Sequence, residues 1–503
     1  MFVETAESER AVVREMNSET IRIKSALSRP ALPTAQPVLR NRITPKIDRM
    51  VGRKTPSKVP NLLTLSTDKF YFMKTRITRK GYGQAGVRFI IVKEEGKGGF
   101  MRSLEDYREI VGDEIIGEIY RKARGLYGRR VLHINSTYQG GGVAEILSSL
   151  VPLLNDIGID AGWRILHGSP DFFTITKKFH NALQGSSINL TDIKQKIYEE
   201  TNENFSVFTH IDHDLVVIHD PQPLPLIRFY KKGQPWIWRC HVDLSAPHQD
   251  LWNYLKKFIL RYDLAVVSNR SFIRKDLPVE QRVIYPAIDP LSAKNKELPQ
   301  SLIEKTLRKF KIPLDKPLLT QISRYDRWKD PEGVIAIFRK VKKKVDCRLV
   351  MCGNMAPDDP EGHLIYEKTR KKAGRLLKDG DVIFINQTND ILVNVLQRVS
   401  RVIVQKSRKE GFGLSVTEAL WKGTPVVASR VGGIPLQVMD GRTGYLLDPN
   451  DEEGFAEKII HLMKDEELRR KLGEAGREHV RKNFLITRHL RDHLDMLKYL
   501  LAQ

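Results

Sequence analysis

The chain has 503 residues, of which 41% are hydrophobic, 29% charged and 8% aromatic. A chain of this length is too long for one ordinary domain and predicts two or three, and its composition excludes whole-chain disorder and collagen-like repeats. The net charge of +23 is compatible with three classes of partner, namely nucleic acids, acidic lipids and phosphorylated ligands.

No feature of the sequence indicates export or membrane insertion. The N-terminus reaches charged residues at once, unlike a secretion signal, and no apolar run has the roughly 18 residues that a membrane helix needs. We therefore predict no membrane span. The three cysteines, Cys240, Cys347 and Cys352, form no CxxC pair, which argues against a disulfide framework or a cysteine-rich zinc site. The reducing cytoplasm is the simplest location.

The first 100 residues differ from the rest of the chain. They hold 20 Lys and Arg against 9 Asp and Glu, so nearly half of the excess positive charge lies there. Residues 1–60 contain six prolines and no sustained period, which predicts a partly flexible N-terminal extension or a start codon placed too far upstream. A basic tail that binds RNA or a surface is the alternative, although no matching motif supports it. Residues 70–72 and 87–92 predict two strands.

From residue 104 the pattern becomes that of an alternating α/β domain. A helical stretch over 104–126 leads into a buried strand over 130–135 and a glycine-rich turn, and a helix with apolar residues at helical spacing follows. Strand, glycine turn and helix form the opening unit of a doubly wound sheet. Further strands are predicted at 215–218, 235–238 and 265–268.

A second series of strands and helices begins near residue 317. Asp330 is a suitable cap and Pro331 a suitable first residue for its first helix. A linker over 285–290 separates the two series. The strands of the second series are predicted at 318–322, 348–351, 382–385, 401–405 and 425–428.

These patterns predict an α/β protein with two Rossmann-like domains. The first spans 101–287 and the second 288–483, and the last helix, within 484–503, is expected to pack back onto the first domain. Open α/β sheets bind ligands at the carboxyl ends of their strands. Two such domains that face each other therefore predict a ligand-binding cleft between them.

The densest cluster of candidate site residues lies at 409–420. Glycines there let backbone N–H groups approach a ligand, and the N-terminus of a helix favours negative charge. Glu410 and Glu418 stand eight residues apart, and carboxylates accept hydrogen bonds from hydroxyls, so a polyol or sugar suits the pair. A capped helix with solvent-facing glutamates explains the spacing equally well.

A second cluster, at 323–330, directly follows a predicted strand. Arg324 and Lys329 on one short loop can neutralise a diphosphate, the arginine by a bidentate fork and the lysine as a point charge. Taken alone, a stripe of exposed charge is the better interpretation of this loop.

A third cluster lies at 236–243, where His241 and Asp243 alternate and are expected on one face of a strand end. A histidine that hydrogen-bonds a substrate is favoured over a metal pair, because no third ligand lies nearby in the sequence. A satisfied core histidine is a serious alternative. The segment 210–214 also contains histidines and aspartates, but it directly precedes a strand and is interpreted as a polar loop.

Together these clusters resemble a known family. Glu410 and Glu418 within EGFGLSVTEAL, followed by GTPVV and GGI, resemble the donor-site signature of retaining GT-B glycosyltransferases of family four, and SRYDRWKDP resembles their diphosphate loop. The first half of the chain resembles a narrower group, the trehalose glycosyltransferring synthases, with retaining trehalose phosphorylases as near relatives. Its matching segments are NSTYQGGGVAEILSSLVPLL, KKFHNALQG, HDPQPLPLI, WIWRCHVDLSAP and AIDPLSAKN.

The resemblance covers residues 101–503 and implies a role for each site residue. The catalytic residues are Arg324, Lys329, Glu410 and His241. The residues that bind the nucleotide sugar are Arg324, Lys329, Glu410, Gly411, Phe412, Gly413, Leu414 and Glu418. The residues at the acceptor glucose are Gly141, Gly142, Asp220, Gln222 and His241. Within these sets, Glu410 and His241 contact the transferred glucose and Glu418 binds the ribose.

The resemblance also implies the reaction, in which α,α-trehalose forms reversibly from ADP-glucose or UDP-glucose and free glucose. The leaving phosphate takes the proton of the acceptor hydroxyl, so no protein nucleophile, cofactor or metal ligand is required, although Mg²⁺ could stimulate without a site on the protein. A trehalose phosphorylase is the main alternative, and a transferase with another acceptor is a further one. The expected partners are the nucleotide sugar, glucose or trehalose, and a second copy of the chain in a homodimer.

One departure from the family pattern stands in the diphosphate loop. Asp330 and Pro331 follow Lys329, where many relatives have glycine. This change is expected to leave Lys329 in place, but it could shift the start of the next helix.

Overall fold

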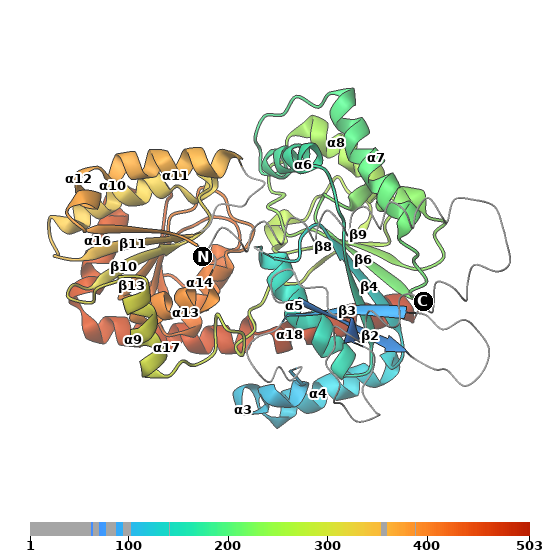
Figure 1. The fold of residues 1–503 in the computed structure, drawn as a ribbon, viewed down its shortest axis with the longest axis horizontal. Coiled ribbons are helices and arrows are strands. Elements are labelled where there is room, and N and C mark those ends of the chain that lie inside the picture. The colour runs from blue at the N-terminus through green and yellow to red at the C-terminus, as the bar shows by residue number, and fades with distance from the viewer. Residues whose placement is uncertain are drawn as a thin grey trace, which may run out of the picture. The chain divides into compact units, whose positions relative to one another are not determined.

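Each of the two strand-and-helix series folds into a six-stranded parallel sheet with helices on both faces (Figure 1). The computed structural model describes residues 62–63, 70–76, 87–93, 102–139, 141–353, 360–387 and 389–502. Most of the N-terminal extension, including residues 1–60 and the flexibility expected there, lies outside the described residues. Residues 1–100 and 101–503 form separate compact units.

The first unit contains a three-stranded antiparallel sheet. Its strands follow each other in chain order, and β2 pairs with β3 from Phe70 opposite Lys93 to Arg76 opposite Val87. The two strands expected from the β-rich segments are confirmed. The strands are β1 (Leu62–Leu63), β2 (Phe70–Arg76) and β3 (Val87–Lys93).

The first parallel sheet has the order β5-β4-β6-β7-β8-β9. Its strands are β4 (Arg130–Asn135), β5 (Asp160–Ile165), β6 (Leu215–His219), β7 (Trp236–Arg239), β8 (Leu264–Val267) and β9 (Glu280–Val283). Its helices are α3 (Arg108–Val111), α4 (Asp113–Ala123), α5 (Gly142–Asp156), α6 (Pro170–Leu183), α7 (Asp192–Phe208) and α8 (Gln249–Ile259).

Strand β7 shows how the sequence divides the core of this sheet. Side chains alternate between the two faces of a strand, so Trp236 and Trp238 lie in the cluster covered by α6, α7 and α8. Ile237 lies in the opposite cluster, which α4 and α5 cover. All three side chains are fully buried.

The second parallel sheet has the order β12-β11-β10-β13-β14-β15. Its strands are β10 (Leu318–Ile322), β11 (Arg348–Gly353), β12 (Val382–Asn386), β13 (Val402–Gln405), β14 (Val426–Ser429) and β15 (Gly444–Leu447). Its helices are α9 (Gln300–Lys309), α10 (Pro331–Lys342), α11 (Pro360–Ala373), α12 (Arg375–Lys378), α13 (Asp390–Val399), α14 (Leu414–Trp421), α15 (Ile434–Gln437), α16 (Glu452–Lys464) and α17 (Glu466–Asn483).

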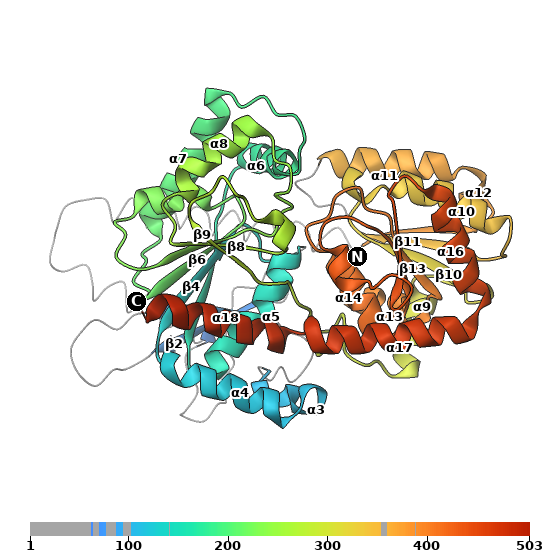
Figure 2. The same ribbon diagram turned by 180° about the vertical axis from the view of Figure 1, so that it is seen from behind.

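The last helix, α18 (Ile486–Leu501), follows α17 directly but packs against α4 and α5 of the first sheet (Figure 2). Its apolar side chains, such as Leu490 and Leu494, join the core beneath that sheet. The chain crosses between the sheets twice at one place, where Ile288 N–H donates to Phe484 O and Ile486 N–H donates to Ile288 O, both at 2.9 Å.

Among the described elements, four strands and one helix break were not predicted, and one of these strands, β1, has only two residues. Strands β5, β9 and β15 all lie at or beside the edges of their sheets, where burial is incomplete and the apolar run is weak. The helical stretch expected over 104–126 is interrupted at Gly112, whose φ of 85° lies in the left-handed region.

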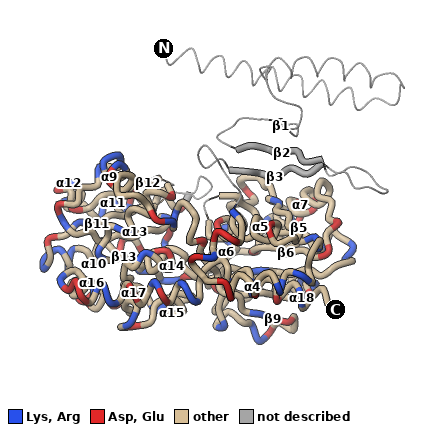
Figure 3. The backbone as a smooth tube through the Cα atoms, turned by 90° about the horizontal axis from the view of Figure 1, so that it is seen from below, with Lys and Arg blue, Asp and Glu red and all other residues tan. Residues whose placement is uncertain are grey.

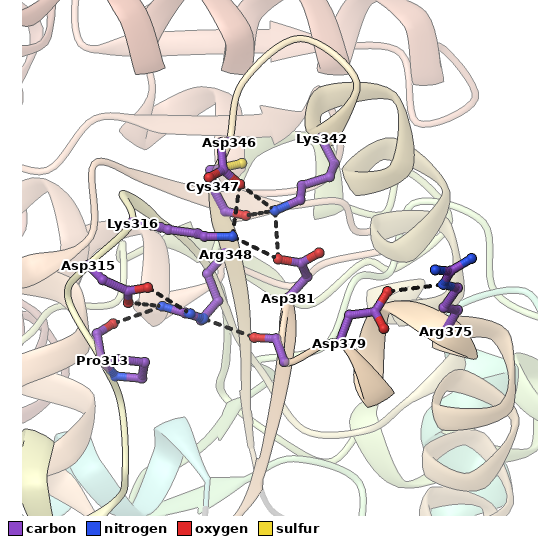
Figure 4. A network of polar contacts seen from close by, with 11 residues as sticks. Pro313, Asp315, Lys316, Lys342, Asp346, Cys347, Arg348, Arg375, Asp379 and Asp381 are labelled. Carbon is purple, nitrogen blue, oxygen red and sulfur yellow. Dashed lines mark hydrogen bonds and ion pairs between the residues drawn. The ribbon is translucent and has the colours of Figure 1, made fainter.

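Positions of Lys and Arg and positions of Asp and Glu are interspersed along the described backbone of residues 101–503 (Figure 3). One network lies at the amino ends of β10, β11 and β12 (Figure 4), where Arg348 donates to the carbonyl of Gly380 and to the carboxylate of Asp315. The amino ends of the strands lie opposite to their carboxyl ends, where α/β sheets bind ligands. Within the described part of the chain, every helix is too short or too polar to cross a membrane.

Candidate active site

The glycine-rich loop between β13 and α14 lies directly against the first half of the chain. A Cβ atom at Gly411 would lie 2.3 Å from the carbonyl oxygen of His241, so no other residue fits there without movement of the backbone. Gly413 caps α14 with a φ of 91°, a conformation that glycine adopts readily. The predicted donor loop and the predicted histidine are therefore neighbours, although 170 residues separate Gly411 from His241 in the sequence.

Glu410 is buried, and its carboxylate accepts hydrogen bonds from three donors. Lys329 forms an ion pair with Oε2, while Ser407 Oγ and Gln405 Nε2 lie 3.2 and 3.4 Å from the same oxygen. Only 8% of Glu410 is exposed, so the alternative of a solvent-facing glutamate is wrong for this residue.

Glu418 is also buried, on the second turn of α14. Its Oε2 accepts a hydrogen bond from Gln397 Nε2 at 3.2 Å, and its Oε1 lies 3.8 Å from the ammonium group of Lys294. The solvent-facing alternative is therefore wrong here too. Phe412 is buried between the two glutamates in sequence, and Leu414 begins the helix.

The loop after β10 presents a group of positive charges beside Glu410. Arg324 and Lys329 are both half-buried, and Lys177 of α6 reaches Asp326 of the same loop at 3.2 Å. Burial, together with the smaller effects of the charges of Lys177 and Arg324, lowers the pKa of the nearby His180 to about 3. A neutral histidine among several cations indicates a site that is ready for an anion.

The structure explains why Asp330 can stand where many relatives have glycine. Asp330 adopts the left-handed conformation, with a φ of 43° and a ψ of 56°, that glycine would adopt at this place. Its side chain caps α10 by accepting from Gly333 N–H at 3.1 Å, and it also pairs with Lys406. Helix α10 begins at Pro331, as the cap pattern predicts.

His241 stands two residues after β7 and is half-buried. Its backbone N–H donates to Asp220 Oδ1 at 2.7 Å, and its Nε2 lies 3.1 Å from Nδ1 of His219. Burial, with a smaller effect of the Arg239 charge, holds its pKa well below the usual value. The ring is therefore neutral at physiological pH and acts through hydrogen bonds.

Contrary to expectation, His241 and Asp243 do not lie on one face of a strand end. Strand β7 ends at Arg239, so the two residues no longer alternate on a strand, and Asp243 accepts from the N–H of Ser245 at 2.8 Å. Among the residues that the structure describes, no group of three His, Cys, Asp or Glu side chains could hold a metal ion. The segment 210–214 belongs to a polar loop in which Asp212 pairs with Arg130 at 2.7 Å.

The predicted acceptor residues are only partly brought together. Gly141 caps α5, and a Cβ atom at Gly142 would lie 3.0 Å from Leu414 Cδ1, so the two helix N-termini meet. Asp220 contacts His241 as described and has a positive φ of 64°. No hydrogen bond among the described residues joins Gln222 to the others, and its carbonyl accepts from Asn202 of α7.

Lys294, which was not predicted as a site residue, joins the two halves of residues 101–503. Its ammonium group lies 2.5 Å from Glu145 of α5 and 3.8 Å from Glu418 of α14. Burial alone would lower the pKa of Lys294, but the charges of Glu418 and Glu145 outweigh that effect and raise it. The residue stands within the segment AIDPLSAKN, and no local period marks it as a site residue.

Two family models match the chain. One is described as "Trehalose synthase, N-terminal domain" and matches residues 133–274, and the other is described as "Glycosyl transferases group 1" and matches residues 303–479. The chain is 47% identical over 408 residues to the trehalose synthase of Thermococcus litoralis, covering 80% of this chain and 98% of that protein. A trehalose phosphorylase of Pleurotus pulmonarius is 29% identical over 447 residues, covering 78% of this chain and 60% of that protein.

A solved structure supports the same fold at low sequence identity. The sucrose-phosphate synthase of Thermosynechococcus elongatus matches with a TM-score of 0.59 and 18% identity, covering 74% of this chain and all of that one. The expected GT-B fold, with two parallel sheets flanked by helices, is confirmed. The chain belongs to the trehalose synthase family and is a glycosyltransferase.

Proposed function

We propose that the protein transfers glucose from ADP-glucose or UDP-glucose to free glucose, and so forms α,α-trehalose in a reversible reaction. The main support is the ion pair of Lys329 and Glu410, because Glu410 directly precedes Gly411, which packs against the backbone carbonyl of His241. One half of the chain thus presents charge for a diphosphate and a carboxylate for sugar hydroxyls, and the other half presents a neutral hydrogen-bonding ring.

The diphosphate of the donor would bind to Arg324 and Lys329. Its negative charge grows as the bond to the sugar breaks, and fixed cations in a water-poor site stabilise that charge strongly. These two side chains provide the positive charge that the leaving group needs, so the proposal requires no resident metal. Mg²⁺ could still stimulate the reaction from solution.

The transferred glucose would lie between Glu410 and His241, with the backbone amides of the glycine loop beside it. Glu418, on the second turn of α14, would accept hydrogen bonds from the ribose hydroxyls. Both carboxylates are buried, and burial strengthens such hydrogen bonds. The acceptor glucose would approach from the side of Gly142 and Asp220.

In the proposed reaction, the bond between the anomeric carbon and the phosphate oxygen breaks, and a bond from the acceptor oxygen to that carbon forms on the same face. The acceptor hydroxyl loses its proton to the departing phosphate oxygen. Glu410 already accepts from Lys329, Ser407 and Gln405. It therefore serves as a hydrogen-bond acceptor for the sugar, unlike the nucleophilic carboxylate of a retaining glycosidase.

A trehalose phosphorylase is the second candidate, because a phosphorylase is 29% identical to this chain. It would use phosphate in place of the nucleoside diphosphate and release glucose 1-phosphate. The chain spans only 60% of that relative, whereas it spans 98% of a trehalose synthase. The coverage favours the synthase.

A product assay separates the two candidates. Purified protein is supplied with glucose and either nucleotide sugar, without added phosphate or metal. A non-reducing disaccharide that trehalase cleaves supports the synthase and shows the nucleotide preference. No disaccharide, but glucose 1-phosphate from trehalose and phosphate, supports the phosphorylase. The homodimer stays a prediction, which the molar mass from light scattering would test.

A further inference from the structure

A chain of buried histidines leads away from His241 into the first sheet. Nε2 of His241 lies 3.1 Å from Nδ1 of His219, at the end of β6, and Nε2 of His219 lies 3.0 Å from Nδ1 of His133, in β4. His133 and His219 are 0% and 5% exposed. This chain of histidines therefore begins at the candidate active site and ends in the interior of the protein.

All three rings are neutral in the folded protein. Burial is the main cause that holds the pKa of His133 and of His219 well below the usual value, and neighbouring histidines lower each of them further. The guanidinium group of Arg239 lowers the pKa of His219 and His241 in the same direction. A neutral imidazole has one N–H donor and one bare nitrogen acceptor, so the hydrogen bonds of the chain must all run in one direction.

The innermost histidine, His133, indicates in which direction the hydrogen bonds between the three rings run. Nε2 of His133 is buried and has no hydrogen-bond partner among the described residues. If the bonds ran inward from His241, this nitrogen would carry an unpaired N–H. If they run outward, it is only an unpaired acceptor, and buried donors without a partner are rarer in folded proteins than buried acceptors without one. The outward direction is therefore favoured.

We infer that His133 and His219 are positioning residues, which hold the ring of His241 in the tautomer with a bare Nε2 and a protonated Nδ1. Nδ1–H is then the donor that His241 offers to a sugar hydroxyl, an assignment that rests on the proposed function. The hydrogen bond that one ring nitrogen makes sets which nitrogen carries the proton. For metal-ligating histidines the loss of such an outer partner typically costs about 10- to 100-fold in affinity or activity, and a loss of the same size is expected here.

His493 of α18 provides a matched control. Its ring stacks on His133 with the centroids 5.2 Å apart, and it is as buried as His219, at 4% exposed. It stands outside the hydrogen-bonded chain, because its Nε2 has no partner among the described residues. His493 also lines a cavity of about 20 Å³. A variant at His493 disturbs the same core without breaking either of the two hydrogen bonds that join His133, His219 and His241.

The kinetic test compares three variants of the full-length protein in the product assay. His133→Leu removes the donor to His219 and is expected to lower kcat about 10- to 100-fold, with the KM for the nucleotide sugar within about threefold of wild type. His133→Asn places an amide N–H near the position of Nδ1 and is expected to recover kcat to within about threefold of wild type. His493→Leu is expected to keep kcat within about threefold of wild type.

The tautomer is measured separately, so that the result does not depend on turnover. In ¹⁵N-histidine-labelled wild-type protein, the signals of His241 are those lost in His241→Gln, and they should show a protonated Nδ1 and a bare Nε2. A wild-type protein with this tautomer but without trehalose formation would contradict only the proposed function. A protonated Nε2 on His241, or equal loss of kcat in His133→Leu and His493→Leu, would overturn the positioning role.

Discussion

Lys329 donates to the carboxylate of Glu410, and this ion pair joins two loops that stand 81 residues apart in the sequence. The sequence analysis assigned Lys329 to the diphosphate and Glu410 to the sugar. The structure brings both groups to one place, where a bound nucleotide sugar would present its phosphate and its glucose side by side. The charge of Glu410 therefore holds Lys329 in place, in addition to its proposed contact with a sugar hydroxyl.

Glu410→Gln should leave the fold intact and lower kcat about 100-fold or more, because the amide cannot balance the buried charge of Lys329. The measurement is the rate of trehalose formation, together with the thermal midpoint. Glu453→Gln is the matched control, since Glu453 also pairs with a lysine but is 81% exposed at the side chain. Near-normal turnover of Glu410→Gln would contradict the site assignment.

Arg324→Ala should raise the KM for the nucleotide sugar about tenfold or more and leave the KM for glucose nearly unchanged. The loss of a charged hydrogen bond to the diphosphate, at about 1.5–3 kcal/mol, gives this magnitude. Arg375→Ala, on the short helix α12 with 91% of its side chain exposed, controls for the loss of one positive charge. Equal changes in both KM values would place Arg324 outside the diphosphate site.

Much of the fold could be predicted from local sequence patterns. Buried central strands such as β4 and β10 are short apolar runs bounded by turn residues, and both lie at the predicted positions. The edge strands β5, β9 and β15 are only partly buried, and they were missed because β5 and β9 contain polar residues and β15 is only four residues long. The cap at Asp330 was predicted because capping needs only neighbouring residues.

Less of the candidate site could be predicted from local sequence patterns. The clusters around Arg324, Glu410 and His241 are local in the sequence, and so each could be found separately. Lys294 and Glu145 are 149 residues apart, and His133 and His219 are 86 residues apart. Such contacts depend on which strands become neighbours and on how the two sheets meet, so no periodicity within one segment indicates them.

Lys294→Met should destabilise the protein, because it leaves Glu145 and Glu418 close together without their shared cation. Removal of one partner of a fully buried pair costs about 3–5 kcal/mol. The side chain of Glu145 is 41% exposed, so solvent screening should reduce the loss here to about 1–3 kcal/mol. The KM for the nucleotide sugar should also rise, since Glu418 loses its orientation.

The double variant Lys294→Met with Glu145→Gln tests this explanation. Removal of the second charge should restore part of the lost stability, so that the effects of the two changes are not additive. Urea unfolding of the wild type, both single variants and the double variant measures this coupling. Additive effects would show that Lys294 stabilises the protein by packing alone.

Arg348→Met should lower stability without changing either KM. Arg348 lies in the polar network of Figure 4, at the sheet edge opposite the candidate site, where it donates to Gly380 O at 2.9 Å and to Asp315 Oδ1 at 2.6 Å. The loss of these bonds should cost about 1–3 kcal/mol. Arg375→Met, in the same figure, should cost less than about 0.5 kcal/mol because its ion pair with Asp379 is exposed. A change in KM for Arg348→Met would indicate coupling across the sheet.

The raised pKa of Asp220 should make the stability of the protein depend on pH. Burial raises its pKa to about 6 in the folded protein, although the N–H of His241 and the charge of Arg239 oppose the shift. Between about pH 4 and pH 6 the folded protein thus binds a proton that the unfolded chain has released. The contribution of Asp220 to stability is therefore present below about pH 4 and is lost as the pH rises through 6.

Asp220→Asn removes this titration while keeping the geometry, because asparagine tolerates the positive φ and its Oδ1 can still accept from His241. Relative to wild type, the free energy of unfolding of Asp220→Asn should rise from pH 4 to pH 6 and level off above pH 7. Urea unfolding at each pH measures the difference, with the exposed Asp250→Asn as the control. A difference that is constant over this range would mean that Asp220 titrates alike in both states, and that burial does not govern its ionisation.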